Sequence, residues 1–505
     1  MKRFLWKNIA VIIAVIFAAG CAAPKAVEKS DPQTSAMTTA RGQAETLLGQ
    51  MEQLANKIAG IGQSFEPDEI AKTVFRIRIT KDVTLPIISV NTGGEEILSL
   101  EEYVVCTVDV FNCEEAWIIE SASAGIRVRG NSSAYYGDVD QIRKNPVPYR
   151  IKFDSKTNLL GMNDGAECKS WVLLKNDWDL IRNDIAFRFG RTIIGENTFC
   201  SDARFVHLYI NNKFAGVYLL CEQSQINPNR VDITEPEEGY TGTDIGYYFE
   251  LDNYAWSEPE KPFIQLDYGR YTVTDVEGET REFVPAEYSI KNDVFDQEQI
   301  DFADKYLNNV FEIVYRACER GEYLTFDENY DLVESEFDNA EDTVRAVMDV
   351  QSAIDMYLLY EIVHDYDCGE GSFYLCVDFA KDSKCPKLQF TSPWDFNWAY
   401  DGSTTRYWAA AFCEQSFAEQ YGDRSNPWFI VLMKQDWFAK LASEKWTKLQ
   451  NEGKIDGCVK EEIRLLEVYK DDLNRDSDSA VDGAFRLIEW IENRIDWMDE
   501  TFLKK

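Results

Sequence analysis

The chain has 505 residues, 45% of them hydrophobic, and a formal net charge of −36. The apolar content is sufficient for a large folded core in one elaborated domain or in several domains. The acidic balance argues against nucleic acid as a partner and against adhesion to an anionic lipid surface, because both are bound by clustered cations. The 12 cysteines form no C-x-x-C pair and there are only two histidines, so a structural zinc site is not expected. The sequence leaves open whether some cysteines pair.

The first residues, MKRFLWKNIAVIIAVIFAAGC, place three basic residues before an apolar run and small residues before Cys21. This order is typical of a secretory signal peptide. The AAGC ending resembles the lipobox of bacterial lipoproteins, which implies removal of residues 1–20 and a lipid on Cys21. The chain is then expected outside the cytoplasm, held at the membrane by that anchor. A plain secreted protein or an uncleaved anchor is the alternative.

Residues 21–68 are expected to be a tether, with a helix near 41–60, because large apolar residues are few there. Residues 69–125 are predicted to form a β-rich segment. TVFRIRIT at 73–80 and LPIISVNTGG at 85–94 alternate apolar and polar residues as strands do. The segments at 101–111 and 116–130 continue the same pattern.

From residue 149 the signals are mixed. YRIKF at 149–153 predicts a strand with Tyr149, Ile151 and Phe153 on one face and Arg150 and Lys152 on the other. WDLIRNDIAFRFGRTII at 178–194 has the apolar spacing of a helix. RFVHLYINNKFAGVYLLCEQ at 204–223 predicts a hairpin that turns at Asn211-Asn212.

Residues 235–300 contain acidic, β-like pieces, and helices dominate from residue 300 onward. A helix is predicted for DVQSAIDMYLLYEIVHDY at 349–366. A short hairpin runs from SFYLCVDF at 372–379 to KLQFTSPWD at 387–395, and amphipathic helix fills the tail from about 430 to 505. The predicted class is α+β, with a β-rich N-terminal part and a helical C-terminal part.

Two aspartates flank that short hairpin. Asp367 follows the long helix in HDYDCGEGS, and Asp395 lies between Trp394 and Phe396 in FTSPWDFNWAYDG. Carboxylates at the entrance and exit of one hairpin are expected to lie side by side. Phosphoryl transfer needs such a pair, because one aspartate accepts the hydroxyl proton and another holds Mg²⁺ on the phosphates. The alternative to a catalytic pair is that both are ordinary loop aspartates, and that the aromatic residues beside Asp395 only pack its turn.

Cationic and acidic strand residues are the next candidates. Lys152 has the position of a strand lysine that reaches nucleotide phosphates, although a solvated strand face is the commoner explanation. Arg127 and Arg129 lie on one face of IRVRG. Glu222 ends the strand VYLLCEQ and is expected either to pair with a basic residue or to lie at the surface.

The two histidines do not suit a catalytic triad. His207 falls within a predicted strand and is expected to be packed there, while His364 adjoins Asp365 and Asp367 and is a minor candidate for positioning a substrate. The chain contains no nucleotide-binding P-loop, G-x-S-x-G or H-E-x-x-H motif.

Over residues 75–505 the sequence resembles the CotH family of spore-coat-type atypical protein kinases. The most diagnostic motifs are AGVYLLCEQ after a hairpin and PWD after the final strand. The full set that carries the resemblance, in chain order, is VRGNSS at 128–133, PYRIKF at 148–153, LLGM at 159–162, WVLL at 171–174, LIRNDIAFRFG at 180–190, FVHLYINNKFAGVYLLCEQ at 205–223, FYL at 373–375 and PWDFNWAYDG at 393–402.

The resemblance implies a distorted kinase fold over residues 126–430, a helical extension at 431–505, and phosphorylation of Ser or Thr in secreted or surface proteins with ATP and Mg²⁺. It further implies catalytic roles for Asp367 and Lys152, and metal binding by Asp395 and Ser372. Matching positions then place the following residues around the nucleotide: Arg129, Asn131, Lys152 and Glu222. Arg182 and Asn183 would order the site from their helix.

The chain departs from the family pattern in the catalytic loop, in the PWD-x-D segment and in the hairpin turn, where Asn212-Lys213 stands in place of Asn-Gly. The family's catalytic loop looks like N-x-D-x-x-x-x-N, and Asp365 and Ser372 occupy its two Asn positions; Asn397 replaces the second acidic residue of PWD-x-D. A neutral hydroxyl is a weaker Mg²⁺ ligand than an amide carbonyl. The first interpretation is therefore a lipid-anchored kinase that acts on exported proteins, and the second is a catalytically degenerate binding or structural protein of the cell surface. A polysaccharide-binding protein is a third, given 13 Trp and 25 Tyr.

Overall fold

The computed structural model describes residues 75–76, 79–80, 83–175, 180–252, 255, 261–274, 280–283, 285–400, 410 and 426–503. The chain forms two compact units, Met1–Asp82 and Val83–Lys505. In the first unit the described residues are helical, and Thr80 Oγ1 donates to the Arg76 carbonyl oxygen at 2.9 Å. The strand predicted at 73–80 is therefore wrong at the described residues 75–76 and 79–80, which are helical. The predicted tether, the helix at 41–60 and Cys21 lie outside the described residues.

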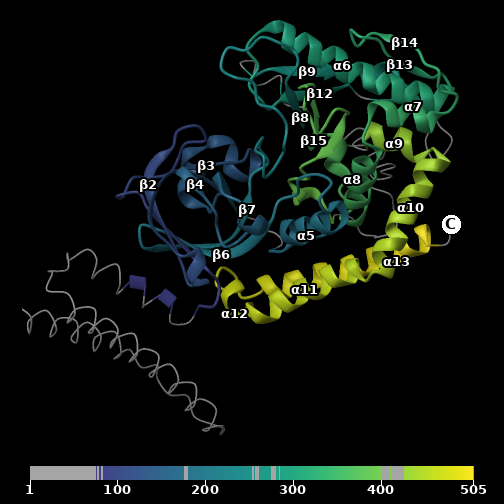
Figure 1. The fold of residues 1–505 in the computed structure, drawn as a ribbon. Helices are drawn as coiled ribbons and strands as arrows, with labels where there is room; N and C mark the ends of the chain where they lie inside the picture. Colours follow the sequence, from purple (N-terminus) through teal and green to yellow (C-terminus); the bar gives the residue numbers. More distant parts are fainter. Residues whose placement is uncertain are drawn as a thin grey trace, which may run out of the picture. The chain divides into compact units, whose positions relative to one another are not determined.

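A closed barrel of seven strands begins the second unit (Figure 1). Its order is β1-β2-β3-β4-β5-β7-β6, and every neighbouring pair is antiparallel except β1 and β6. The strands are β1 (Ile87–Asn91), β2 (Val104–Phe111), β3 (Ile119–Val128), β4 (Tyr149–Thr157), β5 (Cys168–Leu174), β6 (Ala203–Ile210) and β7 (Lys213–Glu222). The predicted boundary between residues 125 and 126 lies inside β3, so the barrel joins the two predicted segments.

The barrel core comes from the alternation that the sequence shows. On β4, Ile151 and Phe153 are buried in the barrel cluster, whereas Lys152 is exposed on the outer face. The β6–β7 hairpin turns at Asn211 and Asn212, whose φ angles of 49° and 64° are those of a type I′ turn. The predicted hairpin is thus confirmed, and asparagine suits it because its side chain tolerates positive φ.

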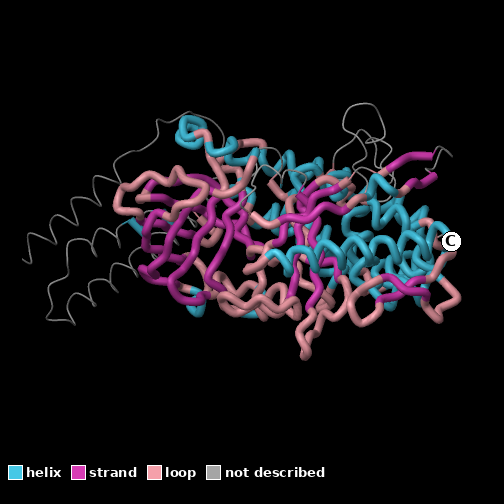
Figure 2. The backbone as a smooth tube through the Cα atoms, turned by 90° about the horizontal axis from the view of Figure 1, so that it is seen from above, coloured by secondary structure: helices cyan, strands magenta, loops and turns pink. Residues whose placement is uncertain are grey.

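A second, five-stranded sheet follows the barrel, so that strands gather in two main places in Figure 2. Its order is β16-β15-β8-β12-β9, with antiparallel neighbours throughout. The strands are β8 (Gly246–Asp252), β9 (Phe263–Leu266), β12 (Ala286–Ile290), β15 (Gly371–Asp378) and β16 (Gln389–Thr391). The predicted hairpin at 372–395 is β15 and β16, and the β-like pieces of 235–300 supply β8, β9 and β12.

Helices make up most of the rest, which confirms the α+β class. They are α4 (Val139–Lys144), α5 (Arg182–Ile194), α6 (Gln297–Tyr315), α7 (Ala340–Val347), α8 (Val350–Ile362), α9 (Pro427–Met433), α10 (Asp436–Asn451), α11 (Lys454–Val468), α12 (Lys470–Leu473) and α13 (Ala480–Phe502). Asp349 caps α8 by accepting the Gln351 and Ser352 N–H groups. Because α8 is buried almost throughout, it is a rigid support for the loop that follows it. No described helix is long and apolar enough to span a bilayer.

The C-terminal helices connect the barrel to the helical part of the second unit (Figure 1). Asp472 Oδ2 accepts the N–H groups of Thr84 and Leu85 at 2.6 and 2.9 Å, and its carbonyl oxygen lies 3.2 Å from His207 Nε2. Asp476 accepts the Val217 N–H at 2.8 Å. His207 is fully buried, as the sequence predicted. The predicted helical extension is therefore an integral part of this unit, and its predicted start at residue 431 lies inside α9.

A buried charge cluster joins α11 to α5. Arg188 Nη2 lies 3.0 Å from Asp184 and its Nε lies 3.2 Å from Glu462, which has no exposed side-chain surface. Burial, followed by the charge of Asp184, raises the pKa of Glu462 well above its ordinary value, against the opposing charge of Arg188. The folded chain therefore holds a proton on Glu462 at a pH where the unfolded chain releases it.

This cluster predicts a pH-dependent stability. Because the folded-state pKa is raised, the contribution of Glu462 is complete below about pH 4.3, the unfolded-state value, and is lost as pH rises toward the folded-state value. Glu462→Gln removes this titration. We expect the free energy of unfolding of the wild type minus that of Glu462→Gln to fall between pH 5 and 8, measured by urea unfolding at constant ionic strength. A difference that is constant over that range contradicts the assignment.

Candidate active site

The loop after α8 carries the first predicted aspartate. His364 leaves the helix with φ of 52° and is buried, and Asp365 then accepts the Asp367 N–H at 3.0 Å. This bond fixes the short 3₁₀ turn Tyr366–Gly369, on which Asp367 is half-buried. Ser372 follows at a β-bulge of β15, with φ of 52°. The bulge interrupts the ladder between β15 and β8 at the residue that the family pattern places at a metal.

The second aspartate, Asp395, lies in a turn just beyond β16, with a left-handed φ of 60°. Its two aromatic neighbours pack on one residue of α5: Trp394 and Phe396 have ring centroids 5.5 and 5.8 Å from Phe187. A positive φ in a residue with a side chain is unfavourable and needs support from its surroundings. The packed rings supply that support, so the aromatic residues on both sides fix the direction of Asp395.

Helix α5 also holds this turn by hydrogen bonds. Asn183 Oδ1 accepts the Phe396 N–H at 3.1 Å, and Asn183 Nδ2 lies 3.2 Å from Asn397 Oδ1. Arg182 Nη1 donates to the carbonyl oxygens of Asn397, at 3.0 Å, and of Ala399. Asn397 therefore supports the turn with its side chain.

Asp365 lies close enough to both predicted aspartates for their charges to act on it. Burial, then the charges of Asp367 and Asp395, raise the pKa of Asp365 well above its ordinary value. Asp395 is exposed to solvent on one side. Desolvation by the surrounding protein raises the pKa of its carboxyl group, and the charge of the Arg129 guanidinium opposes that rise. A ligand can reach the carboxylate from the exposed side. The structure thus gathers acidic groups from both ends of the β15–β16 hairpin.

Glu250 of β8 is a further acidic residue at this place, and sequence reasoning missed it. Its charge also acts on Asp395. Its carboxylate accepts from the Tyr374 hydroxyl of β15 and forms an ion pair with Lys291. Only the pairing of β8 with β15 brings these residues together, and such long-range pairing leaves no local pattern in the sequence.

Arg129, at the end of β3, lies close to Asp395, and further arginines gather around it. The Arg129 guanidinium lies 5.4 Å from the centre of the Trp394 ring, a cation–π contact that joins the end of β3 to the Asp395 turn. Arg127 and Arg150 are partners in the β3–β4 ladder. Burial, together with the nearby charges of Arg127, Arg129 and Arg230, lowers the pKa of Arg150. Four guanidiniums therefore lie close together in a chain that is strongly acidic overall.

Glu222 is buried and engaged with protein donors. Its Oε1 lies 3.2 Å from both Arg230 Nε and Asn163 Nδ2, and its Oε2 accepts the Asp202 N–H at 3.2 Å. It thus pairs with a basic residue, as one of the two sequence alternatives expected. Since these bonds occupy both oxygens, Glu222 positions Arg230 at the arginine cluster.

The other predicted residues lie apart from these contacts. Lys152 is exposed on β4 and forms no ion pair among the described residues, whereas Arg150, two positions earlier, belongs to the arginine cluster. Asn131 is exposed at the start of the short turn Ser132–Gly137. His364 packs against Trp490 of α13, with ring centroids 5.7 Å apart. The sequence roles of these residues remain predictions.

The residues present fit a polyphosphate and a divalent cation. Within the described part of the chain, Arg150 Nε and Arg230 Nη2 are buried and have no hydrogen-bond acceptor, and phosphate oxygens are suitable acceptors. No three described His, Cys, Asp or Glu side chains are arranged to hold a metal ion by themselves. Mg²⁺ bound with phosphates needs only one or two carboxylates, and Asp395 with Asp367 meets that need.

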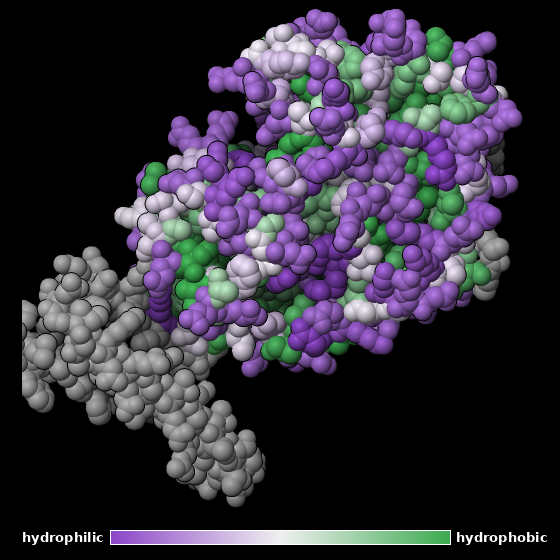
Figure 3. All heavy atoms as spheres, in the orientation of Figure 1, coloured by the Kyte–Doolittle hydropathy of each residue, from purple (hydrophilic) through white to green (hydrophobic). Residues whose placement is uncertain are grey.

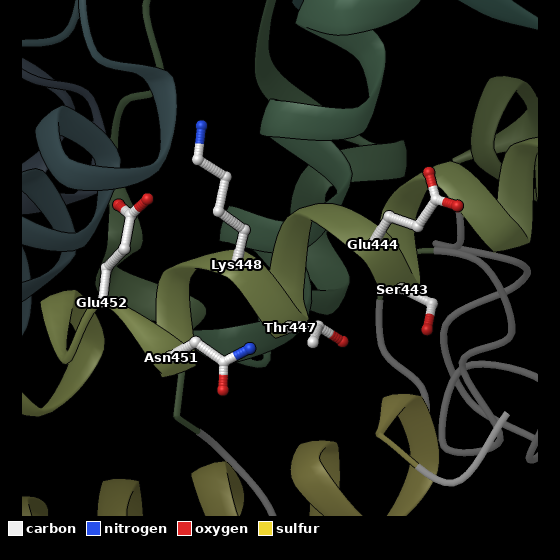
Figure 4. Close-up of a pocket in the computed structure, with 6 residues that line it drawn as sticks. All are labelled: Ser443, Glu444, Thr447, Lys448, Asn451 and Glu452. Carbon is white, nitrogen blue, oxygen red and sulfur yellow. The ribbon is translucent and has the colours of Figure 1, made fainter.

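The hollow in Figure 4 lies elsewhere and is a poor candidate. Its lining, Ser443, Glu444, Thr447, Lys448, Asn451 and Glu452, comes from α10 and the residue that ends it. The visible face of the molecule is mostly hydrophilic (Figure 3), so a group of polar side chains on the surface does not by itself mark a site. The acidic and arginine clusters differ from this hollow because distant segments converge there.

Comparison with known proteins gives one family. Residues 126–498 match the family model described as CotH kinase protein. No curated protein matches the chain. The matched range begins within β3 and includes both aspartates, the arginines of β3 and β4, and the C-terminal helices almost to their end.

Proposed function

Because the chain belongs to the CotH kinase protein family, we propose that it transfers the γ-phosphate of ATP to Ser or Thr hydroxyls of surface or secreted proteins. The observation that carries the proposal is the placement of Asp367 and Asp395 around Asp365, next to an arginine cluster in which the buried Arg150 Nε and Arg230 Nη2 atoms lack acceptors. Phosphoryl transfer depends on positioning and charge stabilisation, and these are the two properties that the clusters supply.

In this proposal each residue has a separate task. When bound, ATP supplies the transferable phosphoryl group and Mg²⁺ supplies a cation that neutralises phosphate charge. Asp395 binds the cation through its solvent-exposed carboxylate. Asp367 accepts the hydroxyl proton of the substrate, and its backbone is kept in place by Asp365. Arg150 and Arg230 bind phosphate oxygens.

The cellular setting is part of the same proposal. The signal sequence and the AAGC ending support an exported lipoprotein anchored through Cys21, with exported proteins as its substrates. ATP and a protein substrate are the expected partners. Nucleic acid is not, because the arginines gather at one buried place in a chain with a net charge of −36.

A second candidate function is a surface binding protein on a kinase-like framework without catalysis. One observation favours it: Ser372, at the bulge of β15, stands where the family loop has Asn. A hydroxyl there binds Mg²⁺ more weakly than an amide oxygen. The two functions differ in nucleotide binding, which calorimetry measures directly.

The test is calorimetric titration of the full-length chain, in detergent, with ATP in the presence and absence of Mg²⁺. We expect binding only with Mg²⁺. Charge-assisted hydrogen bonds contribute about 1.5–3 kcal/mol, so Arg150→Met is expected to weaken binding by roughly 10- to 100-fold, with Lys152→Met weakening it as well. Lys156→Met, on the same strand and also exposed, is the matched control and should bind as the wild type does.

Two outcomes would change this assignment. Normal binding by Lys152→Met, with weak binding by Arg150→Met, would remove Lys152 from the site and leave the arginine cluster in it. If no nucleotide binds under any metal condition, the kinase proposal is overturned and the binding protein replaces it.

A further inference from the structure

A pair of cysteines lies behind the β15–β16 connection, outside the site described above. Cys376 is in β15 and Cys385 precedes β16; their sulfur atoms are 3.7 Å apart, and only 1% and 6% of the two residues is exposed. The Asp378 N–H donates to the Cys385 carbonyl oxygen at 2.8 Å, which fixes the two backbone segments side by side. The sulfurs are thus held in van der Waals contact as free thiols.

The two thiols differ in their access to solvent. Cys385 lines a surface hollow together with Arg345, Lys384 and Lys387, whereas Cys376 does not line it. Asp349 lines the hollow too, and two of its three cations are paired with carboxylates, Arg345 with Glu341 and Lys384 with Asp232, so the hollow has little net positive charge. Because Cys385 lines the hollow and Cys376 does not, a small dissolved disulfide can reach Cys385 first, with the Cys376 sulfur 3.7 Å from it.

We propose that Cys376 and Cys385 form a dithiol–disulfide pair that a small-molecule disulfide oxidises through Cys385. The Cys385 thiolate attacks one sulfur of glutathione disulfide, whose S–S bond breaks and releases one glutathione thiolate. The Cys376 thiolate then attacks the Cys385 sulfur of the mixed disulfide and releases the second glutathione. The protein loses two electrons and two protons, and one glutathione disulfide becomes two glutathione molecules.

The bond would close the connection between the strands that carry the acidic cluster. β15 begins immediately after the Asp367 loop, and β16 ends four residues before Asp395. A disulfide between residues 376 and 385 limits the freedom of that connection in the unfolded chain. The chemistry does not depend on kinase activity. In the cell it needs an oxidising compartment, which the proposed export would supply.

The test is equilibration of the full-length chain with glutathione disulfide, followed by denaturation, alkylation and mass spectrometry. We expect two fewer alkylated cysteines than in the reduced sample, and one cross-linked peptide pair that contains residues 376 and 385. Cys376→Ser should stop at the mixed disulfide and carry glutathione on Cys385. Cys385→Ser should carry none on Cys376, which is shielded. Cys113→Ser, at a half-buried thiol in the barrel part, is the control and should oxidise as the wild type does.

Several results would overturn the proposal. One is full alkylation of both residues after oxidation of the wild type. Another is a cross-link from either residue to a different cysteine. A third is glutathione on Cys376 in Cys385→Ser, which would show that Cys376 is not reached through Cys385. The wild-type measurement decides the first two even if a serine variant fails to fold.

Discussion

Asp367→Asn is expected to abolish phosphoryl transfer while leaving Mg²⁺-dependent ATP binding nearly unchanged, and Asp395→Asn is expected to abolish both. An amide at 367 cannot accept the hydroxyl proton, but the loop keeps its shape because the Asp367 N–H still donates to Asp365. An amide at 395 removes the charge of the solvent-exposed carboxylate. Losses of about 10³-fold or more in turnover, roughly 4 kcal/mol of transition-state stabilisation, are expected for each.

The measurement is transfer of labelled γ-phosphate to the chain itself and to casein as a generic acceptor, alongside calorimetry of ATP binding. Asp382→Asn is the matched control, because Asp382 is exposed in the connection between β15 and β16. Equal loss of ATP binding in Asp367→Asn and Asp395→Asn would contradict the separate tasks. Undiminished transfer in Asp367→Asn would remove Asp367 from catalysis.

Local patterns in the sequence predicted much of the fold. The Asn211-Asn212 turn, α8 and the β15–β16 hairpin each depend on neighbouring residues: a turn type, an apolar period and an alternation. The flanking aspartates were predicted for the same reason, since a hairpin returns the chain to where it began. These elements are the ones whose geometry a short stretch of chain determines.

Long-range pairing could not be predicted in this way. Closure of the barrel requires β1 to pair with β6 in parallel, across more than a hundred residues of chain. The place of Glu250 beside Asp395 depends on the β8–β15 pair. Arg150 and Lys152 look equivalent in sequence because they share one face of a strand. Only the neighbours that the fold brings to Arg150 distinguish them.

The buried ion pair between α8 and α13 predicts the largest effect on stability. Arg494 and Glu361 are both fully buried; Arg494 Nη2 lies 2.9 Å from Glu361 Oε2, and its Nε donates to the Glu361 carbonyl oxygen at 2.9 Å. Burial lowers the pKa of Arg494 to about 10. Arg494→Met leaves the buried Glu361 carboxylate without its cationic partner and is expected to lower the free energy of unfolding by about 3–5 kcal/mol, measured by denaturant unfolding.

The same pair links stability to the site, because Glu361 lies in the last turn of α8, four residues before Asp365. Glu361→Met combined with Arg494→Met removes both charges, so we expect it to recover most of the stability that Arg494→Met loses. Arg486→Met, at an exposed position of α13, is the matched control and should unfold as the wild type does. If Arg494→Met lies within about 1 kcal/mol of the wild type, then α13 does not hold α8, and the support of the Asp367 loop must come from α5 and the sheet instead.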